Sequence, residues 1–444
     1  MSLTRYENDT IAAVSTPFGK GGIAVIKLSG PDSVRLLKII FSSSSDPEKN
    51  IRKMIYGHIK ENSQTIDNVL ACYMKAPHSY TGEDVVEIQS HGGYAAAEAI
   101  LGLLLRNGAR PAEHGEFTKR AFLNNKIDLA QAEAIMEIVS ADNIEHLKSA
   151  ENIHSGELSK KIENLINEIN TCLSFIEFNI DFNDHGIDAV KKEEIKKSLQ
   201  NAHKIIKEMV LSYKTAKRIK HGINIVITGK VNAGKSSLFN KLLGKKRAIV
   251  NSNPGTTRDW LEEKIEIEEI PINLIDTAGI RFSNDEIEKE GVSETERLLK
   301  EADIVIHLTE ITETHKKPLK KTGKCIYILS KADISEDRDE KEFIYISSET
   351  GEGIGALITE IVKKAKNLLK SGSKGQPIII DRHRNELKLA EENISRALTN
   401  IETMSEEFIA FEIKEAIKHL QAIIGKNIEI AVLDKIFNNF CIGK

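Results

Sequence analysis

Residues 229–236 read GKVNAGKS, a match to the phosphate-loop pattern Gly-x-x-x-x-Gly-Lys-Ser/Thr. The apolar run INIVIT at 223–228 precedes the loop, and SLFNKLL at 237–243 follows it with helical spacing. In this context backbone N–H groups and a helix N-terminus hold phosphates, while Lys235 reaches the outer phosphates and Ser236 offers a hydroxyl to Mg²⁺. The stretch therefore predicts a nucleoside-triphosphate site. Its expected contacts are Asn232, Ala233, Gly234, Lys235, Ser236 and Ser237.

Two further motifs belong to the same kind of site. The run INLI at 272–275 ends in Asp276-Thr277-Ala278-Gly279, which predicts an acidic residue facing the metal and a glycine near the γ-phosphate. Between the two motifs lies GTTRD at 255–259, where Thr257 is the expected second Mg²⁺ ligand. The residues expected to contact the nucleotide here are Asn251, Ser252, Asn253, Pro254, Gly255, Thr256, Thr257, Asp276, Thr277, Ala278 and Gly279.

A third group of residues identifies the base. Ser330-Lys331-Ala332-Asp333 follows the run IYIL at 326–329, and Asp333 can accept hydrogen bonds from N1–H and the exocyclic amine of guanine. Adenine offers no such pair of donors, so the predicted nucleotide is GTP. The usual motif has asparagine where this chain has Ser330, and the shorter side chain predicts weaker nucleotide binding with guanine selectivity retained. Ser347 and Ser348 are expected in the last base-contacting loop.

Composition limits the function classes. The 444 residues carry a net charge of -4, so no global positive field points to a nucleic-acid partner. The four cysteines are widely spaced without a CxxC pair, which favours reduced thiols over disulfides or a zinc site. The first residues lack an apolar signal core, and no apolar run approaches the ~20 residues of a membrane span. We therefore expect a soluble cytoplasmic protein with no membrane partner.

The pattern along the chain predicts three domains: residues 1–122, a helical domain from 123–215 and 377–444, and a GTPase domain at 216–376. The first reads as mixed α/β, with strands near 10–15, 23–28, 69–73 and 85–89 and helices near 33–41 and 94–106. Its glycine-rich loop GKGG at 19–22 lacks a following helix, so a hairpin turn is favoured over a second phosphate loop. Helical spacing covers 128–219, around a break at 179–186, and returns at 382–440. The fold class is thus α/β plus all-α, with a doubly wound, mainly parallel GTPase sheet inserted in a helical domain.

Several stretches outside the GTPase motifs resemble a known family. They are TPFGKGGIAV at 16–25, TGED at 81–84, HGG at 91–93, EFTKRAFLN at 116–124, DLAQAE at 128–133 and the terminal FCIGK at 440–444. In these stretches the chain is similar to the MnmE (TrmE) family of tRNA-modification GTPases. The resemblance spans the whole chain.

The resemblance implies an N-terminal domain that dimerises and binds 5-formyltetrahydrofolate or a related tetrahydrofolate. Carried over by position, the folate-site residues are Lys27, Glu87, Lys126 and Lys444. Family members usually have arginine at the position of Lys27, and lysine lacks the planar bidentate fork. The resemblance also implies a homodimer that works with the flavoprotein MnmG (GidA), in a heterotetramer or larger complex. Together they place an aminomethyl or carboxymethylaminomethyl group on carbon 5 of the wobble uridine of certain tRNAs.

Hydrolysis needs groups that the local motifs do not supply. A Ras-like enzyme places glutamine after Asp-x-x-Gly to orient water, whereas this chain has Ile280. The resemblance implies that Glu288 takes this catalytic role. It also implies that K⁺ takes the place of an arginine finger when two GTPase domains meet, with Asn232, Asn251, Asn253 and Thr256 as oxygen ligands. Arg258 and Arg281 are alternatives, for which we prefer structural or switch roles.

The alternative function is a ribosome or RNA assembly GTPase that acts as a binding switch. Its GTPase motifs would look much the same. Assembly factors usually append a basic RNA-binding domain, whereas this chain appends a near-neutral mixed domain and a helical one. A third alternative, an interaction protein with a degenerate GTPase domain, rests on Ser330 and predicts little hydrolysis.

Overall fold

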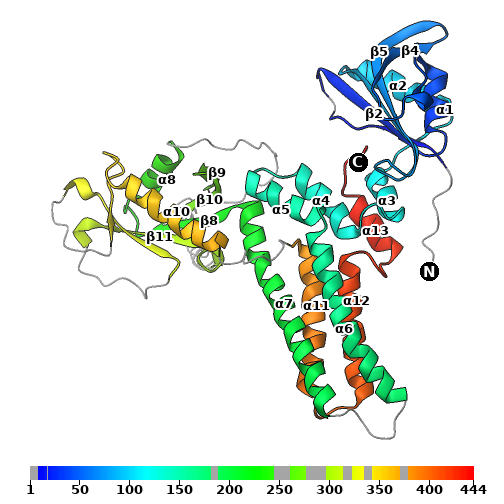
Figure 1. The fold of residues 1–444 in the computed structure, drawn as a ribbon. Helices are drawn as coiled ribbons and strands as arrows, with labels where there is room; N and C mark the ends of the chain where they lie inside the picture. Colours follow the sequence, from blue (N-terminus) through cyan, green and yellow to red (C-terminus); the bar gives the residue numbers. More distant parts are fainter. Residues whose placement is uncertain are drawn as a thin grey trace, which may run out of the picture. The chain divides into compact units, whose positions relative to one another are not determined.

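The computed structural model describes residues 9–17, 19–181, 189–244, 261–276, 297–313, 323–334, 343–370 and 379–444. The chain divides into two compact units, whose elements are labelled in Figure 1. Unit 1 consists of residues 1–139, 151–202 and 389–444, and unit 2 consists of residues 140–150 and 203–388. The boundaries of the three domains expected from the sequence stay a prediction.

Unit 1 contains a seven-stranded sheet in the order β3-β4-β5-β6-β2-β1-β7. Neighbouring strands pair antiparallel, except β1 and β7, which are parallel. Helices α1 and α2 pack on one face through apolar side chains. The bounds are β1 Ile11–Val14, β2 Ile23–Ser29, α1 Ser33–Ile40, β3 Phe41–Ser42, β4 Ile55–Glu61, β5 Gln64–Met74, β6 Val85–His91, α2 Tyr94–Arg106 and β7 Arg110–Pro111.

Alternation along the central strands places charged residues on the other face of this sheet. In β2, Ile26 and Leu28 are buried among the α1 and α2 side chains, and Lys27 between them is half-buried. In β6, Glu87 is likewise half-buried between two buried residues. Because successive side chains of a strand point to opposite faces, Lys27 and Glu87 lie on the face away from α1 and α2.

Most elements of this region agree with the sequence prediction, including α2 over its full length. The GKGG loop at 19–22 connects β1 and β2, which pair antiparallel, so the hairpin interpretation is confirmed. The prediction missed β4. Gly57 interrupts its apolar pattern, and a Cβ there would come within 2.4 Å of the Phe41 ring. Glycine inside a strand is typical of such close approach.

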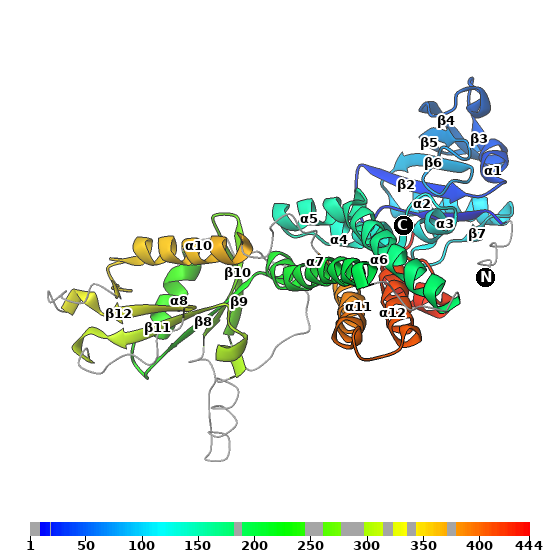
Figure 2. The ribbon, with the colours of Figure 1, turned by 60° about the horizontal axis from the view of Figure 1, so that its bottom comes forward.

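The remaining helices of unit 1 form a packed group in which α6 lies beside α12 (Figures 1 and 2). Ion pairs join the two segments, with Lys414 Nζ 2.7 Å from Glu177 Oε1 and Lys426 Nζ 2.9 Å from Glu163 Oε1. The expected packing of the C-terminal tail on the middle helices is thus confirmed for α12. The bounds are α3 Glu116–Leu123, α4 Leu129–Val139, α6 Glu157–Asp181, α12 Glu406–Ile423 and α13 Ile430–Phe437.

Helical spacing between 128 and 219 predicted two long stretches, and the structure has more breaks. The region holds α4, α5 (Ile144–His154), α6 and α7 (Ala189–His221). Gly156 follows α5 with a left-handed φ of 88°, a conformation that ends helices and that suits glycine. Helices α7 and α11 (Asp381–Asn400) contribute residues to both units. Within the described part of the chain, no helix is long and apolar enough to span a bilayer.

Unit 2 contains a six-stranded sheet in the order β13-β12-β11-β8-β10-β9. All strand pairs are parallel except the pair of the edge strand β9 with β10, which is antiparallel. Helices α8 and α10 share one apolar cluster with the sheet, and Leu298 and Ala302 belong to another cluster with Val226 and Ile275, so helical residues cover both faces. The bounds are β8 Ile223–Gly229, α8 Lys235–Leu243, β9 Leu261–Ile267, β10 Ile270–Asp276, β11 Ile304–Glu310, β12 Cys325–Ser330, β13 Ile344–Tyr345 and α10 Ile354–Lys370.

Candidate functional site

The phosphate loop of unit 2 connects the central strand β8 to helix α8, as the sequence predicts. Strand β8 lies between β11 and β10, where the strand order reverses direction. In open α/β sheets, ligands bind outside the carboxyl ends of the strands at such a switch point. Gly229 at the end of β8 has a left-handed φ of 149°, and a Cβ there would lie 2.4 Å from the Leu308 carbonyl oxygen. The loop therefore requires glycine at this position.

The loop lysine lies within the loop that it is expected to serve. Lys235 Nζ donates hydrogen bonds to the carbonyl oxygens of Gly229 at 2.9 Å and Lys230 at 2.8 Å. Burial lowers the pKa of Lys235, and the charge of Asp276 acts in the opposite direction. Asn232 is exposed with a left-handed φ of 66°, and Ala233, Gly234 and Ser237 complete the loop and the first turn of α8.

The two predicted magnesium motifs meet at one point. The hydroxyl of Ser236, in the first turn of α8, donates to Oδ2 of Asp276 at the end of β10 at 3.1 Å. Asp276 is fully buried. A hydroxyl oxygen beside a carboxylate is the set of hard donors that Mg²⁺ takes in nucleotide sites. These residues therefore fit a magnesium–nucleotide complex.

The predicted base-reading residues cluster at the ends of β12 and β13. Asp333 is exposed in the short 3₁₀ helix at Ala332–Ile334, and a hydrogen bond from Ser347 followed by one from its own backbone amide holds its pKa below the usual range. Ser330 is buried, and its hydroxyl donates to the carbonyl of Thr309 at 3.3 Å. Lys331 Nζ pairs with Glu310 Oε2 at 2.9 Å. Ser348 follows Ser347 in the adjacent loop, where it is half-buried.

Part of the predicted GTPase site lies outside the described residues. This applies to residues 251–257, which contain the expected second magnesium ligand and most expected K⁺ ligands, and to 277–279. It also applies to Glu288 and to the alternatives Arg258 and Arg281. The roles of these residues stay predictions. Among the residues that the structure does describe, no group of three or more His, Cys, Asp or Glu could hold a metal ion.

Two of the residues carried over as a folate site, Lys27 and Glu87, lie on the face of the unit 1 sheet away from α1 and α2. Lys27 in β2 faces Glu87 in β6, with Lys27 Nζ 3.8 Å from Glu87 Oε1. Glu87 in turn faces Cys72 in β5. Burial first, and then the Glu87 carboxylate, raises the pKa of the Cys72 thiol. The three side chains thus form one row across adjacent strands.

The C-terminal tail brings Lys444 to the same row. Burial first, and then the nearby charge of Lys27, lowers the pKa of Lys444. Ser15, which follows β1, donates from Oγ to the carbonyl of Gly443 at 3.1 Å, and the amide of Gly115 donates to the carbonyl of Cys441. These contacts fix the tail beside β1. The structure therefore places Lys444 near Lys27, which in turn faces Glu87.

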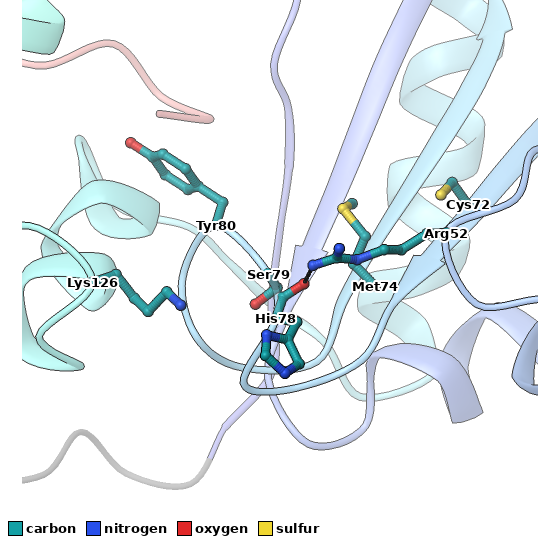
Figure 3. A pocket seen from close by; sticks show the side chains of 7 residues that line it. All are labelled: Arg52, Cys72, Met74, His78, Ser79, Tyr80 and Lys126. Atoms are coloured by element: carbon teal, nitrogen blue, oxygen red, sulfur yellow. Dashed lines mark hydrogen bonds between the residues drawn. The ribbon is translucent and has the colours of Figure 1, made fainter. Parts of the chain in front are cut away.

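Lys126 lies at a cavity next to this row (Figure 3). The cavity has a volume of about 440 Å³, within the range of roughly 300–1,000 Å³ that is usual for small-molecule sites. Its lining includes Arg52, Cys72, Met74, His78, Tyr80 and Lys126. Cys72 belongs both to the row and to the cavity lining, so it connects the row to the cavity.

Sequence reasoning missed Arg52, Cys72 and Tyr80 in this cavity. Tyr80 donates to or accepts from Thr118 at 2.9 Å between the oxygens, and burial raises its pKa. Arg52 precedes the missed strand β4, and no motif marks it. The available signal for Tyr80 was its position directly before the TGED stretch at 81–84.

Comparison with known proteins gives matches over the whole chain. A family model described as MnmE helical domain matches residues 129–441, and one described as GTP-binding protein TrmE N-terminus matches residues 10–126. A relative from Natranaerobius thermophilus named tRNA modification GTPase MnmE is 41% identical, over 98% of this chain and 99% of the relative. Relatives of the same name from Caldicellulosiruptor saccharolyticus and Clostridioides difficile are 40% and 37% identical, each over 99% of this chain and 100% of the relative.

Proposed function

The chain belongs to the MnmE family of tRNA modification GTPases, and from this premise we propose that it hydrolyses GTP in the course of modifying tRNA. The observation that carries the GTPase part is the meeting of Ser236 and Asp276 beside the phosphate loop. Two motifs 40 residues apart in sequence converge there at the switch point of a doubly wound sheet. That convergence is what a phosphate loop and its acidic partner require.

Different residues of the site would bind the phosphates, the metal ion and the base. Backbone N–H groups of the loop and of the α8 N-terminus would donate hydrogen bonds to the phosphate oxygens. Lys235 Nζ now donates to the carbonyls of Gly229 and Lys230, and it would donate to the outer phosphates when the nucleotide binds. The hydroxyl groups of Ser236 and Thr257 would hold Mg²⁺, and the Asp276 carboxylate would accept a hydrogen bond beside them. The ion would neutralise charge on the phosphates. Asp333 would read the guanine. Ser330 would make fewer contacts than asparagine, because its short side chain is tied to Thr309.

For hydrolysis we assign Glu288 to orient the attacking water, since Ile280 cannot do so. Asn232 with Asn251, Asn253 and Thr256 would hold K⁺, which supplies the positive charge that other GTPases obtain from arginine. Asn232 is exposed, and its side-chain amide carries a carbonyl oxygen that can coordinate a cation, which fits this role. The GTPase domains of a homodimer would pair in the GTP-bound state and separate after hydrolysis.

For the modification step we assign Lys27, Glu87, Lys126 and Lys444 to a reduced folate. The cluster of Lys27, Glu87 and Lys444 beside a cavity supports this assignment, because it offers both charge signs to a ligand with donors and carboxylates. The folate would supply a one-carbon unit. With the flavoprotein MnmG, the protein would place an aminomethyl or carboxymethylaminomethyl group on carbon 5 of the wobble uridine of certain tRNAs.

The deciding experiment measures GTP turnover by the purified protein in KCl and in NaCl at matched ionic strength. The expected result is a large preference for K⁺ that disappears in Glu288→Ala, with the neighbouring-acid control Glu286→Ala unchanged. Slow turnover that is indifferent to the cation and to Glu288 would contradict K⁺-dependent pairing. It would favour a ribosome or RNA assembly GTPase, which acts as a switch without modification chemistry.

A further inference from the structure

We propose that Arg52 and Lys126 form a carboxylate-binding subsite at the cavity in unit 1. This inference rests on the proposed folate site, and under that function the carboxylates are those of the glutamyl tail of the reduced folate. The subsite would give the protein a preference for folates that carry glutamate over the same pteridine without it. Arg52 is not among the residues that the family resemblance supplied.

The hydrogen bonds of the two cations leave N–H donors for a ligand. Arg52 donates through Nη2 to the carbonyl of His78, and Lys126 Nζ donates to the carbonyl of Pro77 at 3.0 Å. Both partners are neutral oxygens of one loop. Arginine has five N–H donors and lysine three, so each cation keeps donors for a ligand. Figure 3 shows the two side chains reaching this loop from opposite sides.

The described lining of the cavity contains no carboxylate to balance the two cations. None of the described residues that line the cavity is acidic, and within the described residues neither Arg52 nor Lys126 forms an ion pair. Lys27, by contrast, is paired with Glu87. Two cations at one cavity that contains no carboxylate attract anions. A planar guanidinium can donate two parallel hydrogen bonds to the two oxygens of a carboxylate.

The charged side chains of the row and of the cavity follow one order across the sheet. Across β2, β6 and β5 the row runs from Lys27 through Glu87 to Cys72, a span of roughly 10 Å at the usual strand spacing. Arg52 follows next, because its amide donates to the carbonyl of Tyr73 at 2.8 Å. The row therefore offers a carboxylate in its middle and unpaired cations at the cavity end.

A reduced folate has the complementary polarity. The pteridine ring presents N–H donors, which suit the Glu87 carboxylate, and the other end carries the glutamyl carboxylates. This match orients the ligand with its pteridine at the row and its tail toward Arg52 and Lys126. A free amino acid carboxylate has the same chemistry as the tail, so the experiment separates the two sources.

The test measures binding to the full chain by isothermal titration calorimetry. The ligands are 5-formyltetrahydrofolate, its triglutamate, the pteroate analogue without glutamate, and free glutamate. We expect the pteroate analogue to bind about tenfold more weakly than the monoglutamate, since charge-assisted hydrogen bonds are lost. Arg52→Gln and Lys126→Gln should remove this difference, and Arg52→Lys should keep part of it. Lys53→Gln, an exposed neighbour outside the cavity lining, should change nothing.

The outcomes separate this inference from the proposed function. If wild type binds the folate and the pteroate analogue equally, and Arg52→Gln binds both as wild type does, the subsite is wrong while the folate site stands. If no folate binds at all, both are wrong. Binding of free glutamate that depends on Arg52, together with equal binding of folate and pteroate, would assign the cations to a free carboxylate and overturn the tail assignment. A weaker effect of Arg52→Gln at high ionic strength would support an electrostatic origin.

Discussion

The Ser236 hydroxyl donates to Asp276 Oδ2 across 3.1 Å, from the first turn of α8 to the end of β10. Replacing Ser236 by alanine removes the hydroxyl oxygen that we propose as a Mg²⁺ ligand and leaves the buried Asp276 without this donor. We expect Ser236→Ala to raise the Mg²⁺ concentration needed for half-maximal GTP turnover by roughly 10- to 100-fold. Turnover measured across a Mg²⁺ titration checks this value.

Asn240→Ala is the matched control for this change. Asn240 is an exposed residue of the same helix and is not among the expected nucleotide contacts. Its Mg²⁺ dependence should equal that of wild type. An unchanged Mg²⁺ requirement in Ser236→Ala would remove Ser236 from the metal site.

The base-reading role that we propose for Asp333 predicts that a substitution there changes the preferred nucleotide. The low pKa of Asp333 keeps its carboxylate ionised and able to accept two hydrogen bonds from guanine. Asparagine presents an amide donor instead, which opposes the guanine amine and suits the carbonyl at the same place in xanthine. We expect Asp333→Asn to weaken GDP binding on the order of 100-fold and to bind xanthosine diphosphate more tightly than GDP.

Fluorescence titration with labelled GDP and xanthosine diphosphate measures this switch. Glu349→Gln changes an exposed acid in the neighbouring loop and should leave both affinities as they are. If Asp333→Asn kept wild-type affinity for GDP, another residue would read the base, and Ser330 with its tie to Thr309 would be examined next.

The GTPase site was readable from the sequence because each of its motifs is contiguous. The phosphate loop follows one strand and begins one helix, so residues 223–243 alone carry the signal. The meeting of Ser236 with Asp276 then follows from the rule that parallel strands end at one edge of the sheet. The local pattern could also place Asp333 at a strand end.

The unit 1 cavity could not be read in this way. Lys27 faces Glu87 through the register of β2 and β6, and Arg52 lines the same cavity as Lys126 although 74 residues separate them in sequence. Register depends on the global pairing of the sheet and not on local spacing. Resemblance supplied Lys27, Glu87 and Lys126, whereas Arg52 required the structure.

The tail that carries Lys444 gives a prediction about Gly443. Its φ of 88° is left-handed, and a Cβ would lie 2.8 Å from Ser15 Cα and 2.9 Å from the Val14 oxygen. Alanine at this position therefore displaces the tail and moves Lys444 away from Lys27. We expect Gly443→Ala to weaken folate binding roughly tenfold, or about 1.4 kcal/mol.

Calorimetry with 5-formyltetrahydrofolate measures the effect, and GTP turnover without folate serves as the second readout. Gly22→Ala is the control, because a Cβ there meets nothing within 4 Å. Both variants should keep basal GTP turnover. Full folate affinity in Gly443→Ala would show that Lys444 is not needed at the site.

The last prediction concerns a cluster of buried charged side chains at helix α3 of unit 1. The Arg120 and Glu116 side chains are each 1% exposed, and Arg120 Nη2 lies 2.9 Å from Glu116 Oε1. Arg110 Nη2 also lies 2.6 Å from Glu116 Oε1. Burial alone would raise the pKa of Glu116, but hydrogen bonds from Arg110, the Glu113 amide and Arg120 outweigh it and hold the pKa below 4.5.

Because the folded pKa of Glu116 is lowered, its ionised form stabilises the fold above pH 4.5, and this stabilisation is lost as pH falls through the folded pKa. Glutamine at 116 removes the charge-assisted hydrogen bonds to Arg120 and Arg110, while Asp9 stays beside both arginines and Glu83 stays beside Arg120. We expect Glu116→Gln to lower the free energy of opening of α3 by about 2 kcal/mol at neutral pH, and by progressively less below pH 4.5. Hydrogen exchange of the α3 amides measures this energy. The exposed control Glu113→Gln should have the same free energy of opening as wild type. If Glu116→Gln lowered this free energy equally at every pH, packing and not charge would stabilise α3.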